Sequence, residues 1–317
     1  MTQISREDIQ IISRHSNLSE DSINNILRDE LYNNSISWKK FLRLFFMSLG
    51  IGFTTAGIIF FFAFNWDQLH KFIKIGLIEG LIVLITFIAL FSNIKSDFKN
   101  ILLTGSSILV GVLFAVFGQI YQTGANAYDF FLSWTMFISL WVFVSFFPPL
   151  WLVYIALINT TLVLYAQQVA QDWSGLFVIN LLLIINVLFL LCFLFGSKVI
   201  SKIKSPGWFI NILVLTCAVL CTIGFIIGIY DDYQTSFPTL IIITLILYGL
   251  GIKYGLEIKN GFYLAVIPFS IIVIISALLL KISDGEVMFF LVSLFIIASI
   301  TLVISNLIKL QKKWINE

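Results

Sequence analysis

The feature that most constrains this chain is a series of long apolar runs, which begins at residue 41 and continues almost to the last residue. A helix needs about twenty apolar residues to cross the roughly 30 Å of hydrocarbon in a bilayer. The runs have this length and are far too long for the strands of a membrane barrel. In lipid a helix satisfies its own backbone polar groups. The sequence therefore predicts an all-α, polytopic integral membrane protein.

The polar breaks between the runs divide residues 41–317 into about ten predicted transmembrane helices. The spans are expected near 41–63, 73–92, 101–121, 130–147, 150–168, 174–195, 208–229, 237–252, 260–280 and 286–308. The eighth run is short, and only Pro148-Pro149 separates the fourth from the fifth. Nine and ten spans both remain open at this point, and ten is the number we expect.

The composition agrees with a lipid-facing surface. Hydrophobic residues make up 59% of the chain and charged residues 11%, with a mean hydropathy of +1.01. Soluble domains carry roughly a quarter charged residues. The net charge of +2 provides no basic face for nucleic acid. The cysteines Cys192, Cys217 and Cys221 all lie in apolar runs, and the last two are interpreted as small buried hydrophobes.

Residues 1–40 are polar and are predicted to form a short soluble helical hairpin. Ser5 and Ser19 are suitable N-cap residues, each with an acidic residue in the following turn. Five basic against six acidic residues give a net charge of 5 − 6 = −1, which disfavours DNA. An apolar stripe suits docking to a partner protein or to the membrane domain; it comprises Ile23, Ile26, Leu27 and Leu31. The N-terminal segment lacks the early apolar core of a cleavable signal peptide. The first span is therefore expected to direct insertion into the membrane.

The distribution of positive charge predicts that both termini lie in the cytoplasm. With ten spans and a cytoplasmic N-terminus, sixteen Lys and Arg residues fall on the inner side. Only three fall outside, namely Lys71, Lys74 and Lys281. Such a bias follows the positive-inside rule.

Acidic residues sort toward the predicted outer side, where most breaks place an aromatic ring next to an aspartate. One interpretation is an interfacial aromatic belt. The other is an outer vestibule that receives a cation or a sugar-like ligand through carboxylates and ring faces. The vestibule candidates are Trp66, Asp67, Asp172, Trp173, Asp231 and Asp232.

The densest polar cluster runs from Gly118 to Trp134. If the backbone stays helical there, Gln119, Gln122, Asn126 and Asp129 form one polar stripe. This stripe is either a polar path or a hydrogen-bonded helix end that holds the bundle together. The candidate residues of this motif also include Tyr121, Gly124 and Trp134.

Glu79 is the one acidic residue well inside a predicted span. It is expected to be a protonatable relay or an anion paired with Lys71 or Lys74, unless it is hydrated near the interface. The flanking Gly76 and Gly80 have the small-xxx-small spacing that allows a second helix to approach closely. The amides Asn159, Asn180 and Asn186 are expected to form hydrogen bonds between helices.

No enzyme signature is present, so no enzymatic activity, cofactor or metal site is predicted. His15 and His70 have no second ligand at metal spacing. The sequence also lacks a phosphate-binding glycine loop and a nucleophile elbow.

Two segments carry a resemblance to a known family. They are the FNWDQL segment, Phe64 to Leu69, and the GQIYQTGAN segment, Gly118 to Asn126, which is followed by Phe130 to Trp134. Over roughly residues 15–165 the chain resembles the bacterial predicted-membrane-protein family catalogued as domain of unknown function twenty-one fifty-seven. An aspartate often follows GQIYQTGA in that family, whereas this chain has Asn126. The resemblance implies a bacterial inner-membrane protein and implies no reaction.

Two functional hypotheses remain open. The first is a permease or channel-like protein for a small solute of unknown identity, with Glu79 and the stripe from Gln119 to Asp129 as its polar path. The second is a non-transporting membrane subunit or sensor that docks a cytoplasmic or membrane partner through the N-terminal hairpin. The lipid bilayer is the one partner that composition itself implies, and nucleic acid is not expected.

Overall fold

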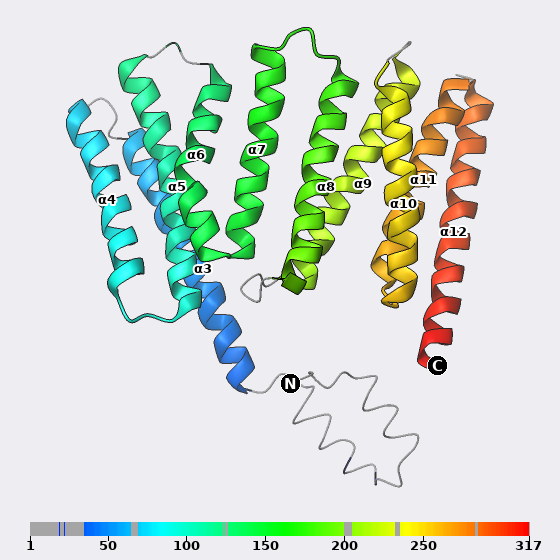
Figure 1. Cartoon of the computed structure of the whole chain (residues 1–317), viewed down its shortest axis with the longest axis horizontal. Coiled ribbons are helices and arrows are strands. Elements are labelled where there is room, and N and C mark those ends of the chain that lie inside the picture. The colour runs from blue at the N-terminus through cyan, green and yellow to red at the C-terminus, as the bar shows by residue number, and fades with distance from the viewer. Residues whose placement is uncertain are drawn as a thin grey trace. The chain divides into compact units, whose positions relative to one another are not determined.

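The computed structural model describes residues 19, 22, 35–64, 69–122, 124, 126–199, 205–231, 235–282 and 285–316. This part of the chain contains ten helices and no strand. They are α3 (Ser35–Phe64), α4 (Lys71–Phe91), α5 (Ser96–Tyr121), α6 (Ala127–Ser145), α7 (Pro148–Gln168), α8 (Gly175–Val199), α9 (Gly207–Tyr230), α10 (Phe237–Glu257), α11 (Gly261–Ile282) and α12 (Glu286–Asn316) (Figure 1).

All ten helices are long and apolar enough to cross a membrane. The prediction of an all-α polytopic fold is confirmed. α3 begins at Ser35, ahead of the expected first span, because a helix satisfies its backbone in water as well as in lipid and need not stop at the hydrocarbon edge. In its first turns the Trp38 ring lies edge-on to Phe41, with 5.7 Å between the ring centroids.

Most of the predicted N-terminal hairpin lies outside the described residues. Ser19 and Ser22 are exceptions: the Ser22 N–H donates to Ser19 Oγ at 3.3 Å. This is the hydrogen bond of a serine N-cap, as the sequence predicts for Ser19.

The break between α6 and α7 accounts for the number of helices. Phe146 adopts a left-handed backbone (φ 47°, ψ 32°), and Phe147 is extended. Pro148 then occupies the first helical position, where its missing N–H costs nothing. The apolar run from residue 130 to residue 168 is therefore two helices.

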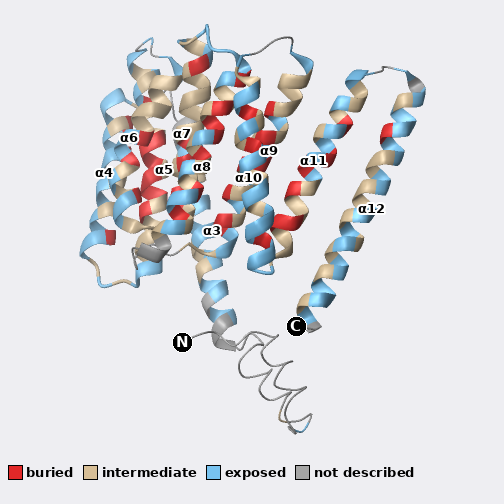
Figure 2. Ribbon diagram, turned by 45° about the vertical axis from the view of Figure 1, so that its right-hand side comes forward, coloured by how far each residue is buried: buried red, intermediate tan, exposed pale blue. Residues whose placement is uncertain are grey.

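The chain divides into two compact units, Met1–Val116 and Phe117–Glu317, called here the first and the second unit. In the first unit α5 carries most of the buried residues (Figure 2). In α3, by contrast, several phenylalanines are exposed. The Thr86 and Ser106 hydroxyls form a hydrogen bond of 3.1 Å between α4 and α5. Gly105 of α5 lies against Ile51 of α3.

The second unit contains α6 to α12, and its successive helices pack against one another. α9 additionally contacts α11, so α9, α10 and α11 form a group of three mutually contacting helices. Two pairs of glycines shape this group. A Cβ atom placed on Gly224 of α9 would lie 2.7 Å from Leu240 of α10, and one on Gly228 would meet the Phe237 ring.

The second glycine pair lies on α10 itself. A Cβ atom on Gly251 would lie 2.7 Å from Ile267 of α11, and one on Gly255 would lie 2.9 Å from the Tyr263 Cβ. Small residues at spacing four let helix backbones approach closely in membranes. α10 is therefore packed on α9 through its first half and on α11 through its last turns.

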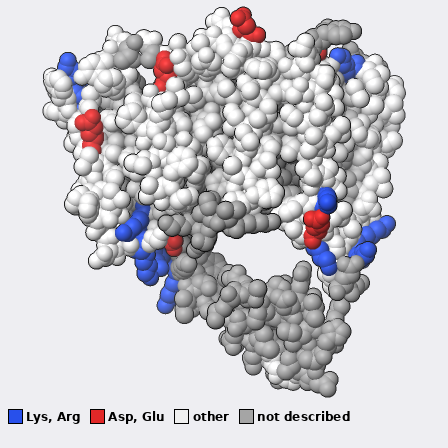
Figure 3. Space-filling model, in the orientation of Figure 1, with Lys and Arg blue, Asp and Glu red and all other residues white. Residues whose placement is uncertain are grey.

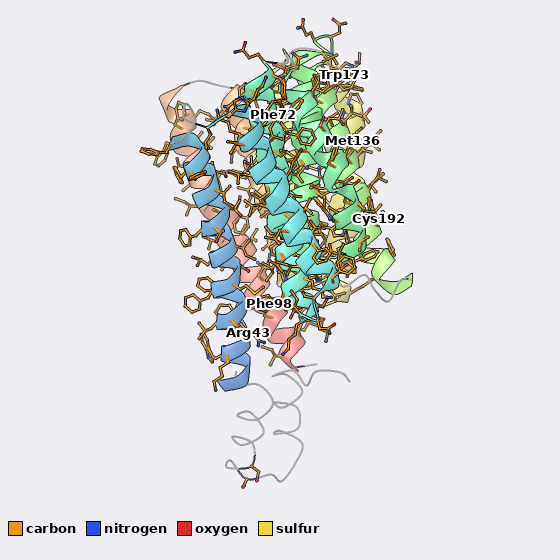
Figure 4. All side chains as sticks on the ribbon, turned by 90° about the vertical axis from the view of Figure 1, so that its left-hand side faces the viewer. Arg43, Phe72, Phe98, Met136, Trp173 and Cys192 are labelled. Atoms are coloured by element: carbon orange, nitrogen blue, oxygen red, sulfur yellow. The ribbon has the colours of Figure 1, made fainter. Side chains whose placement is uncertain are left out.

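The two ends of the second unit differ in charge. One end, called the aspartate end, carries the loop with Asp172 and the α9 terminus with Asp231, and Lys281 Nζ donates to the Ile229 carbonyl at the same end. The opposite, lysine end carries Lys253, Lys259, Lys309, Lys312 and Lys313, with Glu257 beside Lys253. Charged side chains gather at helix ends, and the visible flank between them is almost free of charge (Figure 3). Trp173 lies near the aspartate end, and Cys192 lies farther along the flank of the same unit (Figure 4).

Candidate functional site

The polar stripe expected along Gln119, Gln122, Asn126 and Asp129 does not form. α5 ends at Tyr121, and the backbone then turns left-handed at Gln122 (φ 44°) and Gly124 (φ 63°). α6 begins at Ala127. The condition for a continuous polar stripe is therefore not met, because spacings of three and four align side chains only when the helix is unbroken.

The residues of this motif instead organise a helix start. The Asn126 N–H donates to Asp129 Oδ2 at 3.1 Å, and the Asp129 N–H donates to the Asn126 carbonyl at 3.1 Å. The Tyr128 N–H donates to Gln168 Oε1 at 3.0 Å, which ties the first turn of α6 to the last turn of α7. These contacts satisfy amide groups that a helix N-terminus leaves unpaired.

The remaining motif residues lie on helix surfaces. Gln119 and Tyr121 are exposed, and the Tyr121 ring lies 4.6 Å from that of Phe117. Trp134 is half-buried beside the rings of Phe130 and Phe131. The structure thus brings Asn126 and Asp129 together and leaves the other members of the expected path apart.

Glu79 lies on an exposed face of α4, whereas Lys74 and Ile78 are buried. Its expected pairing with Lys71 or Lys74 stays a prediction. No described atom comes within 4 Å of a Cβ atom placed on the neighbouring Gly80 or on Gly76. The close helix contact expected at these two glycines is absent from the described part of the chain.

The proposed outer vestibule is only partly described: Trp66, Asp67 and Asp232 lie outside the described residues. Asp172 is exposed, and Asp231 follows the last turn of α9, where its N–H donates to the Ile227 carbonyl at 2.8 Å.

Trp173 is part of an aromatic chain at the same end of the unit. Its ring lies 5.6 Å from Tyr165 and 5.2 Å from Phe177, and Tyr165 in turn lies 5.3 Å from Tyr128. These edge-to-face contacts connect the ends of α6, α7 and α8. They are the contacts that stabilise aromatic pairs.

A second polar group, which the sequence did not single out, lies where α9, α10 and α11 meet. Tyr248 OH of α10 and Ser270 Oγ of α11 are 2.5 Å apart, and Ser270 Oγ is 2.5 Å from Thr222 Oγ1 of α9. The Thr222 hydroxyl also donates to the Ala218 carbonyl at 2.8 Å. One hydroxyl from each helix thus joins a single hydrogen-bonded chain.

Cys221 and Thr244 complete this group. The buried Cys221 thiol lies beside the hydroxyls of Thr244 and Tyr248. Thr244 is only 3% exposed, and its Oγ1 has no hydrogen-bond partner among the described residues. Thr216 and Thr222, by contrast, donate to the carbonyl four residues earlier, the usual solution for a threonine in a membrane helix. We call Cys221, Thr222, Thr244, Tyr248 and Ser270 the hydroxyl cluster.

The hydroxyl cluster lies near the middle of its three helices. With a rise of 1.5 Å per residue, Thr222, Thr244 and Ser270 each lie within about 5 Å of the midpoint of their own helix. The sequence shows the individual polar residues inside apolar runs, and this was the available signal. It does not show that residues 22 to 48 positions apart meet.

The three asparagines form the interhelical bonds that the sequence predicts. Asn159 Nδ2 donates to Asn186 Oδ1 at 3.2 Å, and Asn186 Nδ2 donates to Asn159 Oδ1 at 2.8 Å. Asn180 Nδ2 donates to the Ser236 carbonyl at 2.8 Å, and its buried Oδ1 has no partner in the described part of the chain. The interpretation of these amides as links between helices is confirmed.

The chemistry available to the hydroxyl cluster is neutral hydrogen bonding. No group of three or more His, Cys, Asp or Glu residues that could hold a metal ion is found among the described residues. α9 contains no charged residue at all. The charged residues of α10 and α11 are Lys253, Glu257 and Lys281, close to the helix ends.

A family model described as "Predicted membrane protein (DUF2157)" matches residues 14–151. The resemblance inferred from the FNWDQL and GQIYQTGAN segments is thereby confirmed for the first half of the chain. No curated protein and no solved structure matches the chain. The matched range ends before α8, so it does not include the hydroxyl cluster. The chain is a multi-pass helical membrane protein similar over this range to a family of unknown function.

Proposed function

We propose that this protein is a permease or channel-like protein for a small solute, which binds at the hydroxyl cluster between α9, α10 and α11. The observation that carries the proposal is the Thr244 hydroxyl, which is buried at mid-depth with only the Cys221 thiol beside it as a polar neighbour. Substrate sites of many membrane transporters lie near the midplane of the bilayer.

A purely structural role leaves Thr244 with only the Cys221 thiol, whose sulfur is a weak hydrogen-bond acceptor. Burying an unpaired hydroxyl costs about 1–3 kcal/mol. Rotation to the carbonyl four residues earlier would remove that cost, as it does for Thr222. A solute hydroxyl or amide that reached Thr244 would give its side chain a stronger hydrogen-bond partner than the thiol.

The packing of α10 supports a site that opens. α10 contacts α9 at Gly224 and Gly228 and contacts α11 at Gly251 and Gly255, on either side of Thr244 and Tyr248. A tilt of α10 about its middle changes these two contacts in opposite senses. Pro268 in α11 has no N–H for the Leu264 carbonyl, which weakens the helix beside Ser270.

This proposal moves the polar path of the permease hypothesis from Glu79 and the Gln119–Asp129 segment to the hydroxyl cluster of α9, α10 and α11. The alternative, a non-transporting subunit that docks a partner through residues 1–36, rests on residues that are almost all outside the described part of the chain. It becomes the favoured hypothesis if the hydroxyl cluster is never reached from water.

Cysteine accessibility tests the proposal without knowledge of the solute. One variant keeps only Cys221 (Cys192→Ala with Cys217→Ala), and its matched control keeps only Cys217 (Cys192→Ala with Cys221→Ala). Both thiols are buried on α9 one turn apart, but only Cys221 belongs to the cluster. Each variant is placed in lipid nanodiscs and treated with the neutral, hydrophilic reagent 2-hydroxyethyl methanethiosulfonate.

We expect Cys221 to react at least about tenfold faster than Cys217, as for a site opened in a minor conformer. Mass spectrometry of the intact protein measures both rates. Equal, negligible rates at the two positions would mean that water does not reach the cluster, and the permease proposal would then be rejected.

A further inference from the structure

The direction of every hydrogen bond in the hydroxyl cluster follows from one fixed donor. Thr222 donates its single hydroxyl hydrogen to the Ala218 carbonyl, so Thr222 Oγ1 accepts from Ser270. Ser270 has then used its own hydrogen and accepts from Tyr248. The chain runs from Tyr248 through Ser270 and Thr222 to the backbone, with each hydroxyl donating once.

The groups left for a ligand are therefore mostly acceptors. Each hydroxyl oxygen has two lone pairs, and the chain uses one on Ser270, one on Thr222 and none on Tyr248. Thr244 is bonded to none of these hydroxyls, and the weakly polar Cys221 thiol lies beside it. A complementary solute offers several O–H groups as donors and one oxygen as the acceptor for Thr244.

Charge is excluded by the surroundings of the cluster. The cluster contains only hydroxyls and one thiol, and the charged residues of its helices lie close to the helix ends. An ion moved to this depth would lose its hydration without gaining an opposite charge, and the penalty for burying an unpaired ion is several kcal/mol.

We infer that the hydroxyl cluster selects small uncharged polyols, of which glycerol is the simplest probe. The inference rests on the proposed function, because it assigns a substrate class to the same site. A polyol carries hydroxyls that each donate and accept. It therefore fits the free lone pairs of Tyr248, Ser270 and Thr222 together with the hydroxyl of Thr244.

The first test compares reagents that share one reactive group and differ in charge on the variant that keeps only Cys221. Neutral 2-hydroxyethyl, anionic 2-sulfonatoethyl and cationic 2-trimethylammonioethyl methanethiosulfonates are applied to nanodiscs, where both membrane faces are open. Rates are divided by those with a free thiol in solution. We expect the neutral reagent to exceed both charged reagents by at least about tenfold, the ratio for a difference of 1.4 kcal/mol.

The second test is glycerol permeability of proteoliposomes, measured by stopped-flow light scattering. Wild-type protein should accelerate glycerol entry, Thr244→Val should abolish the acceleration, and Thr244→Ser should retain it because the hydroxyl is kept. The matched control is Thr216→Val on α9, whose hydroxyl already donates to the Ile212 carbonyl. This variant should behave as wild type.

The outcomes separate the two proposals. If charged reagents reach Cys221 as fast as the neutral one, or if glycerol entry is unaffected by Thr244→Val, the polyol inference is overturned and the permease proposal stands. If no reagent reaches Cys221, the proposed function itself fails. If Thr244→Val does not fold, loss of glycerol entry in Tyr248→Phe decides the same question.

Discussion

Two pairs of glycines with the same spacing differ in how closely other side chains pack against them. Gly76 and Gly80 of α4 have no described atom near their Cβ positions, whereas Gly224 and Gly228 of α9 lie directly against Leu240 and Phe237. The spacing permits close approach but does not create it, because the neighbouring helix must also present side chains that fill the space. The comparison shows that a small-xxx-small motif indicates an opportunity rather than a contact.

Aromatic side chains of the two units likewise differ in how far they are buried. In the first unit, Phe53 and Phe60 of α3 are 70% and 72% exposed. In the second unit, Trp151 is 6% exposed and lies 5.1 Å from both Phe143 and Phe193, edge-on to each. Lipid tails solvate a ring as well as a protein core does, so hydrophobicity alone does not decide which way a ring faces.

The largest expected effect comes from placing a methyl group at each glycine motif. Gly228→Ala forces the Phe237 ring to move, and overpacking of this kind costs about 1–3 kcal/mol. Gly80→Ala meets open space and gains up to about 1 kcal/mol in helix propensity. SDS titration of the purified protein in mixed micelles gives both free energies of unfolding. Equal losses in the two variants would show that α4 also has a close partner at Gly80.

A smaller effect is expected for the interhelical polar pairs. Asn186→Leu removes one partner of the reciprocal amide pair and leaves Asn159 unpaired, whereas Thr86→Val removes a single hydroxyl bond in the first unit. Interhelical hydrogen bonds in membranes average about 0.6 kcal/mol and reach about 1.7. We expect Asn186→Leu to lie at the upper end and Thr86→Val at the lower end in the same titration.

The double variant Asn159→Leu with Asn186→Leu provides the control for the amide pair. Its loss should be smaller than the sum of the two single losses, because neither amide is left without a partner. Additive losses would indicate that the two amides do not interact in the membrane.

The smallest effects are expected in the GQIYQTGAN segment, where two substitutions by glycine should change the free energy of unfolding in opposite directions. Gln122 has a left-handed backbone, so Gln122→Gly relieves strain and should raise the free energy of unfolding by several tenths of a kcal/mol. Gln119 is exposed in the last turn of α5, so Gln119→Gly should lower it by up to about 1 kcal/mol. A lower free energy of unfolding in both variants would indicate that the helix continues through Gln122, contrary to the structure.

The candidate site was only partly predictable. The asparagines stood out because an amide inside an apolar run needs a partner, and the structure provides Asn186 for Asn159. The stripe from Gln119 to Asp129 does not form because the backbone is left-handed at Gln122. The sequence GQIYQTG does not predict this turn. The membrane orientation and the cytoplasmic position of the termini stay predictions from the distribution of lysine and arginine.

The sequence by itself determined the class of this protein and the approximate bounds of its spans, because both depend on local properties, whereas the backbone at Phe146 and Phe147 decided between nine and ten helices. Apolar length and the need to satisfy backbone groups within a segment act along the chain. Only the tertiary structure decided that Thr222, Tyr248 and Ser270 meet and that Gly228 is covered while Gly80 is bare. These contacts depend on the rotation and crossing of helices. A helix that is apolar on every side has no periodic sequence pattern, so its sequence does not predict which face packs against a neighbouring helix.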